Sequence, residues 1–80
     1  MFNSNMSLSE MDKCIDEMIH TQGYTLRDIL KNHCSRKDLK LYIDKAKEEK
    51  GFQDKDFVDM NTVGGICFCV ADELYNKGGY

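Results

Sequence analysis

The 80-residue chain contains no proline and no tryptophan, and it has no apolar run long enough to cross a membrane. A membrane-spanning helix needs about 18 or more consecutive apolar residues, so the sequence predicts no membrane segment. The first residues lack the basic start and the apolar run of a secretory signal peptide. We therefore expect a cytoplasmic protein whose thiols are reduced and act as small apolar side chains: Cys14, Cys34, Cys67 and Cys69.

The chain also lacks a strong charge of either sign, because its formal net charge is -3 at pH 7. This value argues against a generic nucleic-acid binder. The charge is nevertheless segregated: residues 31–50 are net basic, whereas residues 1–30 and 51–80 are each net acidic. Two interpretations follow. The segments neutralise one another within the fold, or the basic segment forms a face that meets an anionic partner.

Since proline is absent, the helix ends must be set by capping side chains and by glycine. A hydroxyl residue precedes each of four amphipathic segments and can accept a hydrogen bond from the backbone of the first turn. Gly23 and Gly51 supply the stops of the first and third segments. The expected helices span residues 8–22, 26–33, 36–50 and 63–77, and their caps are Ser7, Thr25, Ser35 and Thr62.

The densest apolar stretch, Val63 to Ala71, lies in the last of these helices. A domain of this length has room for one core, so its most apolar element is expected at the centre. The sequence predicts an all-α fold in which residues 1–6 are a flexible leader and residues 7–80 are one domain of four or five short helices around the C-terminal helix. The predicted core is centred on Ile15, Ile29, Ile43, Ile66, Val70 and Leu74.

One alternative changes the fold class. Glycines that precede a β-branched and aromatic run are also typical of a buried strand, which would lie at about 66–71 and give an α+β fold. Between the third and last helices, Asp54 is expected to cap a short helical turn that places Phe57, Val58 and Met60 on the core.

The cysteines, together with His33, are the side chains whose chemistry could support metal binding or thiol reactions. Cys67 and Cys69 are two positions apart, so on a helix their sulfur atoms point in nearly opposite directions and cannot share a metal ion. Together with Cys14, His33 and Cys34 they match no zinc-binding spacing. The sequence therefore predicts no metal site and no cofactor.

A second group, Asp12, Asp16 and His20, follows the i, i+4, i+8 positions of the first helix. Such a stripe could hold a divalent cation or supply acid–base catalysis, but no further ligand or nucleophile accompanies it. We interpret it as a solvated Asp–His pair. No catalytic residue is predicted, and the protein is not expected to be an enzyme; a metal- or thiol-dependent enzyme is the third-ranked interpretation.

Residues 23–37 are similar to a helix-turn-helix, with a short helix, a turn and a second capped helix. In that motif the start of the second helix enters the major groove of DNA. The resemblance implies a DNA-binding regulator that contacts phosphates through Arg36, Lys37 and Lys40. The turn lacks the glycine that often occurs in the motif.

The preferred interpretation is a small non-enzymatic regulator that binds another macromolecule, with a protein as the favoured partner and nucleic acid as the alternative. An adaptor or inhibitor, of the kind that phages and mobile elements encode, suits a compact chain without a catalytic constellation. Apolar side chains predicted at the surface would combine with the basic group in one partner-binding set: Arg36, Lys37, Lys40, Leu41, Phe68 and Tyr75.

Overall fold

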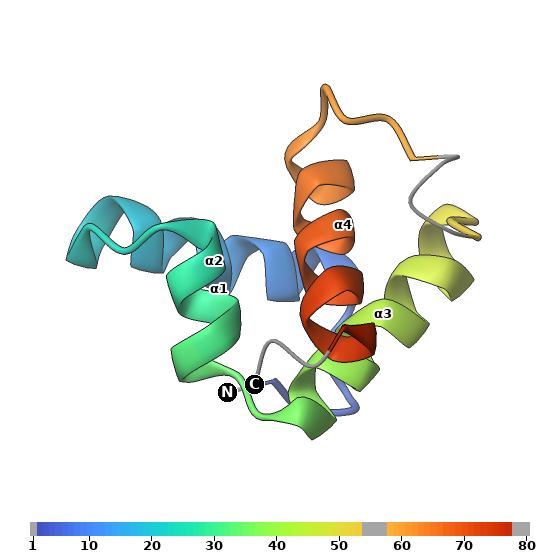
Figure 1. Ribbon diagram of the computed structural model, residues 1–80, viewed down its shortest axis with the longest axis horizontal. Helices are drawn as coiled ribbons and strands as arrows, with labels where there is room; N and C mark the ends of the chain where they lie inside the picture. The colour runs from blue at the N-terminus through green and yellow to red at the C-terminus, as the bar shows by residue number, and fades with distance from the viewer. Residues whose placement is uncertain (1, 54–57, 78–80) are drawn as a thin grey trace.

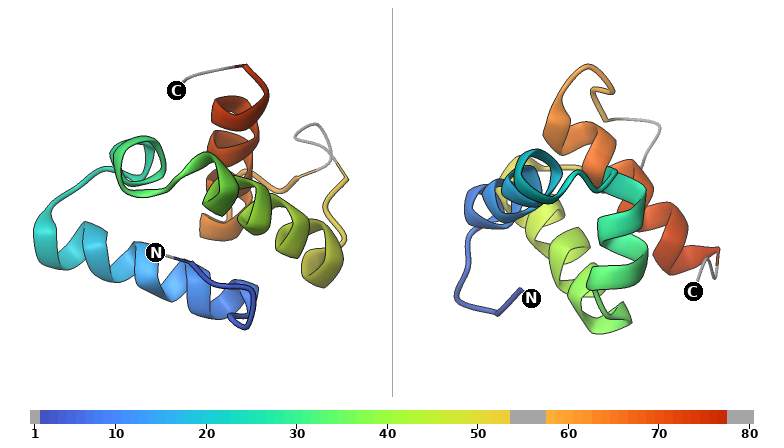
Figure 2. Two further views of the ribbon diagram at one scale, coloured as in Figure 1. Left: turned by 90° about the horizontal axis from the view of Figure 1, so that it is seen from below. Right: turned by 90° about the vertical axis from the view of Figure 1, so that its left-hand side faces the viewer.

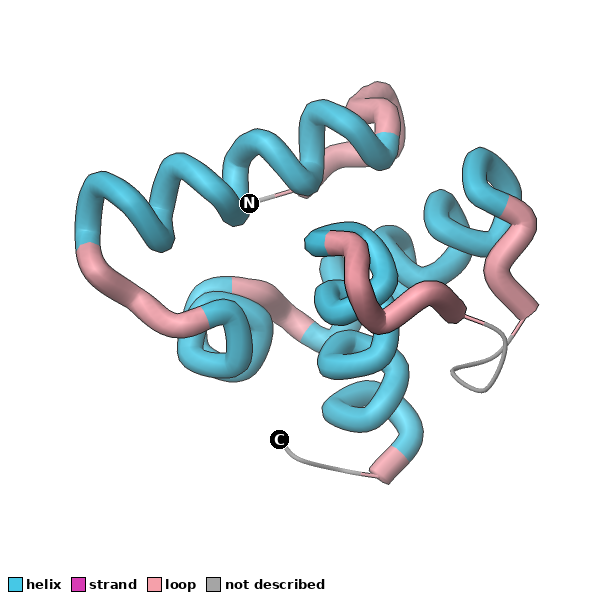
Figure 3. Tube along the Cα trace, turned by 90° about the horizontal axis from the view of Figure 1, so that it is seen from above, coloured by secondary structure: helices cyan, strands magenta, loops and turns pink. Residues whose placement is uncertain are grey.

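The protein folds as a set of short helices around one core, and the all-α prediction is confirmed. The computed structural model describes residues 2–53 and 58–77. Within these ranges the chain forms helices and loops and no strand (Figures 1 and 3). The alternative of a buried strand at 66–71 is wrong, because these residues lie inside the last helix. The elements are α1 (Leu8–Gln22), α2 (Leu26–Asp28), the π-helical segment η1 (Ile29–His33), α3 (Arg36–Lys50) and α4 (Val63–Asn76).

The helix ends follow the capping chemistry of the sequence. The hydroxyl of Ser7 accepts from the Glu10 N–H at 3.2 Å, and the other three predicted caps accept from the third residue of their helices in the same way. Ser35 and Asp38 form a reciprocal capping box. Gly23 and Gly51 end α1 and α3 with φ values of 74° and 72°, a conformation that only glycine adopts without strain.

The helices pack in a chain of contacts. α1 lies against α3, α3 lies against α4, and both α2 and η1 also contact α4 (Figures 1 and 2). None of these helices, within the residues that the structure describes, is long and apolar enough to cross a bilayer. The core includes Ile15, Ile29, Ile43 and Leu74, as predicted, and its largest fully buried side chains are Tyr42 and Phe68.

The segment predicted as a flexible leader contributes to this core. Phe2 is buried, and its ring centroid lies 6.0 Å from that of Tyr42 on α3. The Met6 N–H donates to the Asn3 carbonyl and forms a turn that brings the segment back toward α1. Phe2 was missed because a single aromatic residue in a polar stretch gives no periodic signal.

α4 presents a different face to the core from the one predicted. The sequence placed Ile66 and Val70 at the centre, but Ile66 is 39% exposed and Val70 is only half-buried. The buried face instead consists of Gly65, Cys67, Phe68, Ala71 and Leu74. The helix is therefore rotated about its axis by roughly 100°, the step of one residue in an α-helix.

The loop before α4 also differs from the prediction. Val58 is buried, as expected, but Met60 is 52% exposed, and residues 58–62 form turns instead of a helix. Asp54 and Phe57, assigned to the same helical turn, lie outside the described residues. At the start of α4 the loop passes very close to the helix, because a Cβ atom built on Gly65 would overlap the carbonyl oxygen of Asp59. Glycine is required at this position for steric reasons.

Candidate functional site

The six residues predicted to bind a partner do not form one surface. Phe68 is completely buried and packs against Phe52, with ring centroids 5.2 Å apart. The expectation that Phe68 lies at the surface is therefore wrong. Leu41 and Tyr75 are half-buried, and only the three basic residues of the set are exposed.

Two of these basic residues interact with other parts of the same chain. The guanidinium carbon of Arg36 lies 4.1 Å from the ring centroid of Tyr75, and its Nη1 donates to the Tyr75 carbonyl at 2.8 Å. This carbonyl is in the last turn of α4, where a positive charge interacts favourably with the helix dipole. Lys40 forms an ion pair with Asp44 at 2.6 Å, and this hydrogen bond raises the pKa of the lysine. The basic group at the start of α3 is thus partly neutralised within the fold.

The contacts of Arg36 and the order of the helices can be compared with those of a helix-turn-helix. α2 and η1, the two-residue link of Cys34 and Ser35, and α3 do follow one another as helix, turn and helix (Figure 2). The first residue of the second helix, Arg36, is nevertheless directed at α4. A recognition helix uses its first residues to reach base edges, so this contact opposes that use of α3.

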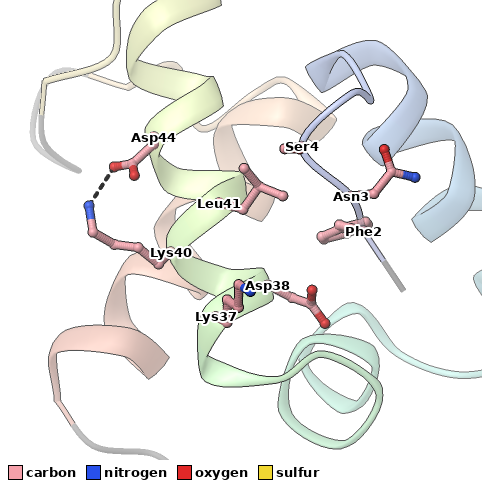
Figure 4. Close-up of a pocket in the computed structure, with 8 residues that line it drawn as sticks. All are labelled: Phe2, Asn3, Ser4, Lys37, Asp38, Lys40, Leu41 and Asp44. Carbon is pink, nitrogen blue, oxygen red and sulfur yellow. Dashed lines mark hydrogen bonds and ion pairs between the residues drawn. The ribbon is translucent and has the colours of Figure 1, made fainter.

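A pocket of about 520 Å³ lies between the N-terminal segment and the outer face of α3. Leu41 points toward Phe2 and Asn3 across this pocket, and Lys40 and Asp44, joined by their ion pair, also line it (Figure 4). Its two lysines are matched by two aspartates, so the pocket offers no net charge to an ion. The lining residues are Phe2, Asn3, Ser4, Lys37, Asp38, Lys40, Leu41 and Asp44.

A second surface, which the sequence did not predict, is formed by the outer face of α4. Within residues 2–53 and 58–77, the exposed large apolar side chains are Met60, Val63 and Ile66. Val63 and Ile66 lie in the first turn of the helix, and Met60 lies in the loop just before it. The Met60 sulfur lies 3.1 Å from the Cys69 sulfur, so the methionine folds back along the helix. Together with half-buried Val70, these side chains form what we call the α4 surface: Met60, Val63, Ile66, Cys69 and Val70.

Acidic side chains border the α4 surface at both ends. Asp59 directly precedes it, and Asp72 and Glu73 follow it on the helix. Glu73 is held by Arg27 at 3.1 Å, with both side chains near half exposure. In contrast, α3 contains six basic residues. The acidic residues of this border and most of the basic residues therefore lie on different helices, although Arg36 of α3 contacts Tyr75 of α4.

The residues considered for metal binding are not brought together. Asp16 and His20 form the expected solvated pair at 3.2 Å. In the part of the chain that the structure describes, no three His, Cys, Asp or Glu side chains are grouped so that they could hold a metal ion. Cys34 and Cys67 are buried, and burial raises the pKa of each thiol to about 12, which makes them poor nucleophiles.

Asp12 is the exception within its stripe, because it turns inward. The Tyr42 hydroxyl donates to its carboxylate at 2.5 Å, and the same hydroxyl also interacts with the Cys67 thiol. Burial raises the pKa of Asp12 above 3.8, although the hydrogen bond from Tyr42 and the charge of Lys50 act in the opposite direction. This short polar chain joins α1, α3 and α4 and is structural in character.

The raised pKa of Asp12 gives a testable pH dependence. A carboxyl group with a higher pKa in the folded than in the unfolded state binds its proton more tightly when folded, so the free energy of unfolding falls as the pH rises above 3.8 through the folded pKa. Asp12→Asn keeps an acceptor for Tyr42 but does not ionise. In urea unfolding at a series of pH values, the variant is expected to gain stability relative to the wild type across that window. A difference that stays constant with pH would contradict this explanation.

Comparisons with known proteins found no matching protein family, no matching curated protein and no matching solved structure.

Proposed function

We propose that the protein is a small non-enzymatic regulator that binds another protein through the α4 surface. The observation that carries this proposal is the grouping of exposed Met60, Val63 and Ile66: two lie on α4, and Met60 lies in the preceding loop with its sulfur against Cys69 of the helix. The other large apolar side chains of the described residues are at least partly buried. Scattered apolar residues at a surface need no explanation, but a contiguous exposed patch is typical of an interaction site.

The size and chemistry of the chain support a binding role. A cytoplasmic adaptor or inhibitor, of the kind encoded by phages and mobile elements, needs a rigid scaffold and an exposed contact face, and it needs no catalytic group. The buried and unreactive thiols of Cys34 and Cys67 suit a reducing compartment. The basic residues at the start of α3, with Leu41 and Tyr75, remain candidates for a secondary contact that steers the partner by charge.

Site-specific crosslinking tests the proposal. A photoreactive amino acid at position 63 is expected to yield a covalent adduct with a protein, because Val63, 63% exposed, is the most exposed of the three exposed apolar residues of the surface. The same amino acid at Lys47, on the exposed side of α3, serves as the matched control and is expected to give no such adduct. Nuclease treatment is expected to leave the adduct unchanged.

A second variant links the adduct to the apolar surface. Ile66→Asp, combined with the photoreactive residue at 63, is expected to reduce the adduct about tenfold or more, because a charged group interrupts the apolar contact. The melting temperature is expected to stay close to that of the wild type, since Ile66 is exposed. An adduct with nucleic acid, lost when Arg36, Lys37 and Lys40 are replaced by alanine, would instead support the DNA-binding alternative.

A further inference from the structure

We infer that the partner contacts the α4 surface with a single amphipathic helix whose apolar stripe is flanked by basic residues. This inference rests on the proposed function and adds to it the shape and charge of the bound segment. It is carried by three features of the surface: the spacing of its apolar side chains, its small extent and the charges at its border.

The spacing of the apolar residues matches helix-on-helix recognition. Val63, Ile66 and Val70 occupy positions i, i+3 and i+7 of α4 and therefore lie along one line of the helix. A second helix presents its own side chains at the same repeat, so its apolar stripe can interdigitate with this line. The line is about 10 Å long at 1.5 Å per residue, which corresponds to two turns of a partner helix.

Met60 broadens this line on one side. Its sulfur is in contact with the Cys69 sulfur, so its flexible side chain lies beside the helix and is still 52% exposed. Methionine is unbranched and polarizable, and it adapts to the shape of an incoming side chain better than a β-branched residue does. The surface thus combines two rigid valines and an isoleucine with one adaptable residue.

The extent of the surface favours a segment over a second folded domain. A stable interface between two globular proteins involves about 20 to 30 residues on each side. The α4 surface contains five, and the nearby charged residues add only a few more. A second copy of this chain would therefore bury too little area through this face alone, whereas one helix of a partner would cover it fully.

The acidic residues that border the α4 surface favour a partner helix with positive charge. Asp59 lies at one end, and Asp72 and Glu73 lie at the other, where Arg27 already pairs with Glu73. The ion pair with Arg27 holds Glu73 in place before binding, so little side-chain entropy is lost when a partner arrives. Lysine or arginine residues beside the partner's apolar stripe would complement this border.

Selection from a displayed library tests the inference directly. We would select random peptides of about 16 residues, roughly four helical turns, against the full chain. Peptides that also bind the Val63→Asp, Ile66→Asp double variant would be removed. The enriched sequences are expected to be net basic, to repeat apolar residues at i, i+3 or i+4 and i+7, and to become helical on binding, measured by circular dichroism.

Two conservative variants test the charge complementarity. Asp59→Asn retains an acceptor for the Asn61 N–H, and Glu73→Gln retains one for Arg27, so neither is expected to alter the fold. Each is expected to lower the affinity of a selected peptide by about two- to fivefold at low salt. The double variant at 63 and 66 is expected to lower it by at least about tenfold. Lys47→Gln on α3 is the control and is expected to have no effect.

The inference would be overturned by surface-dependent peptides that are acidic or bind in an extended form, or by the absence of any surface-dependent peptide. Concentration-dependent dimerisation in sedimentation experiments, abolished by Val63→Asp, would identify a second copy as the occupant and would also overturn it. These outcomes are separable from failure of the proposed function. A protein adduct at position 63 together with non-helical peptides would retain the function and reject only the helix.

Discussion

Replacing Phe68 by alanine is expected to lower the free energy of unfolding by about 3–5 kcal/mol. The ring is completely buried and packs against Phe52, so its removal leaves a cavity at the centre of the core. A small domain has only about 5–15 kcal/mol of stability in total, and this substitution therefore removes a large part of it. Urea unfolding monitored by circular dichroism measures the change.

Val63→Ala is the matched control on the same helix. Val63 is 63% exposed, so its truncation is expected to change stability by less than about 0.5 kcal/mol. The two variants are expected to weaken partner binding by different routes: Val63→Ala removes a contact while the fold stays intact, whereas Phe68→Ala acts only through loss of the folded state. Equal stabilities for the two variants would show that α4 does not bury the face described above.

Gly65→Ala is expected to be the second most damaging change, with a cost of about 1–3 kcal/mol or more. The new methyl group would overlap the Asp59 carbonyl oxygen and would lie 2.8 Å from the Thr62 hydroxyl oxygen. Thr62 caps α4 by accepting from the Gly65 N–H, so the whole loop 59–62 must shift and the cap is weakened. Thermal unfolding measures the loss, and a melting temperature equal to that of the wild type would contradict the close approach.

The neighbouring Gly64→Ala provides a sharp contrast. A Cβ atom at Gly64 would meet only the Asp12 carboxylate, at an ordinary contact distance of 3.7 Å. Alanine favours a helix over glycine by about 0.8–1.0 kcal/mol, so this variant is expected to be more stable than the wild type. Two identical substitutions at adjacent positions should thus have effects of opposite sign.

The helix boundaries could be predicted from the sequence because they depend on local chemistry. Each capping hydroxyl and each terminal glycine acts on residues within one turn, and a single chain contains all of that information. The bounds of α1 and α3 were confirmed, and α4 ends one residue before the predicted end. The second predicted helix is present but divided into α2 and η1, a change from α- to π-helical geometry that no local pattern indicated.

The face of α4 could not be predicted from its apolar residues. Almost every residue from Val63 to Ala71 is apolar, so each side of the helix is suitable for burial. A better signal was present in the polar residues of the second half. Asp72, Glu73 and Asn76 mark the side that faces solvent, and the side opposite to them contains the buried Cys67, Ala71 and Leu74.

The surface position expected of Phe68, one of the predicted partner-binding residues, was wrong for a related reason. Phe68 was placed at the margin of an apolar arc centred on the wrong residues, and the correction of α4 moves it to the core while exposing Ile66. The engagement of Arg36 with Tyr75 depends on the packing of α3 against α4, which local sequence does not specify. Sequence patterns identified the helices, but the surface they leave open is decided by long-range packing.

The position of α4 along the chain has a consequence for synthesis on the ribosome. α1, α2 and α3 are made before α4, yet α3, η1 and α2 all contact it, and α3 and η1 carry buried apolar side chains. Their apolar faces therefore stay open until the last helix has emerged, and the domain cannot close its core one helix at a time. We expect the nascent chain to remain a substrate for chaperones, which bind exposed apolar segments, until residues 63–76 are free to pack.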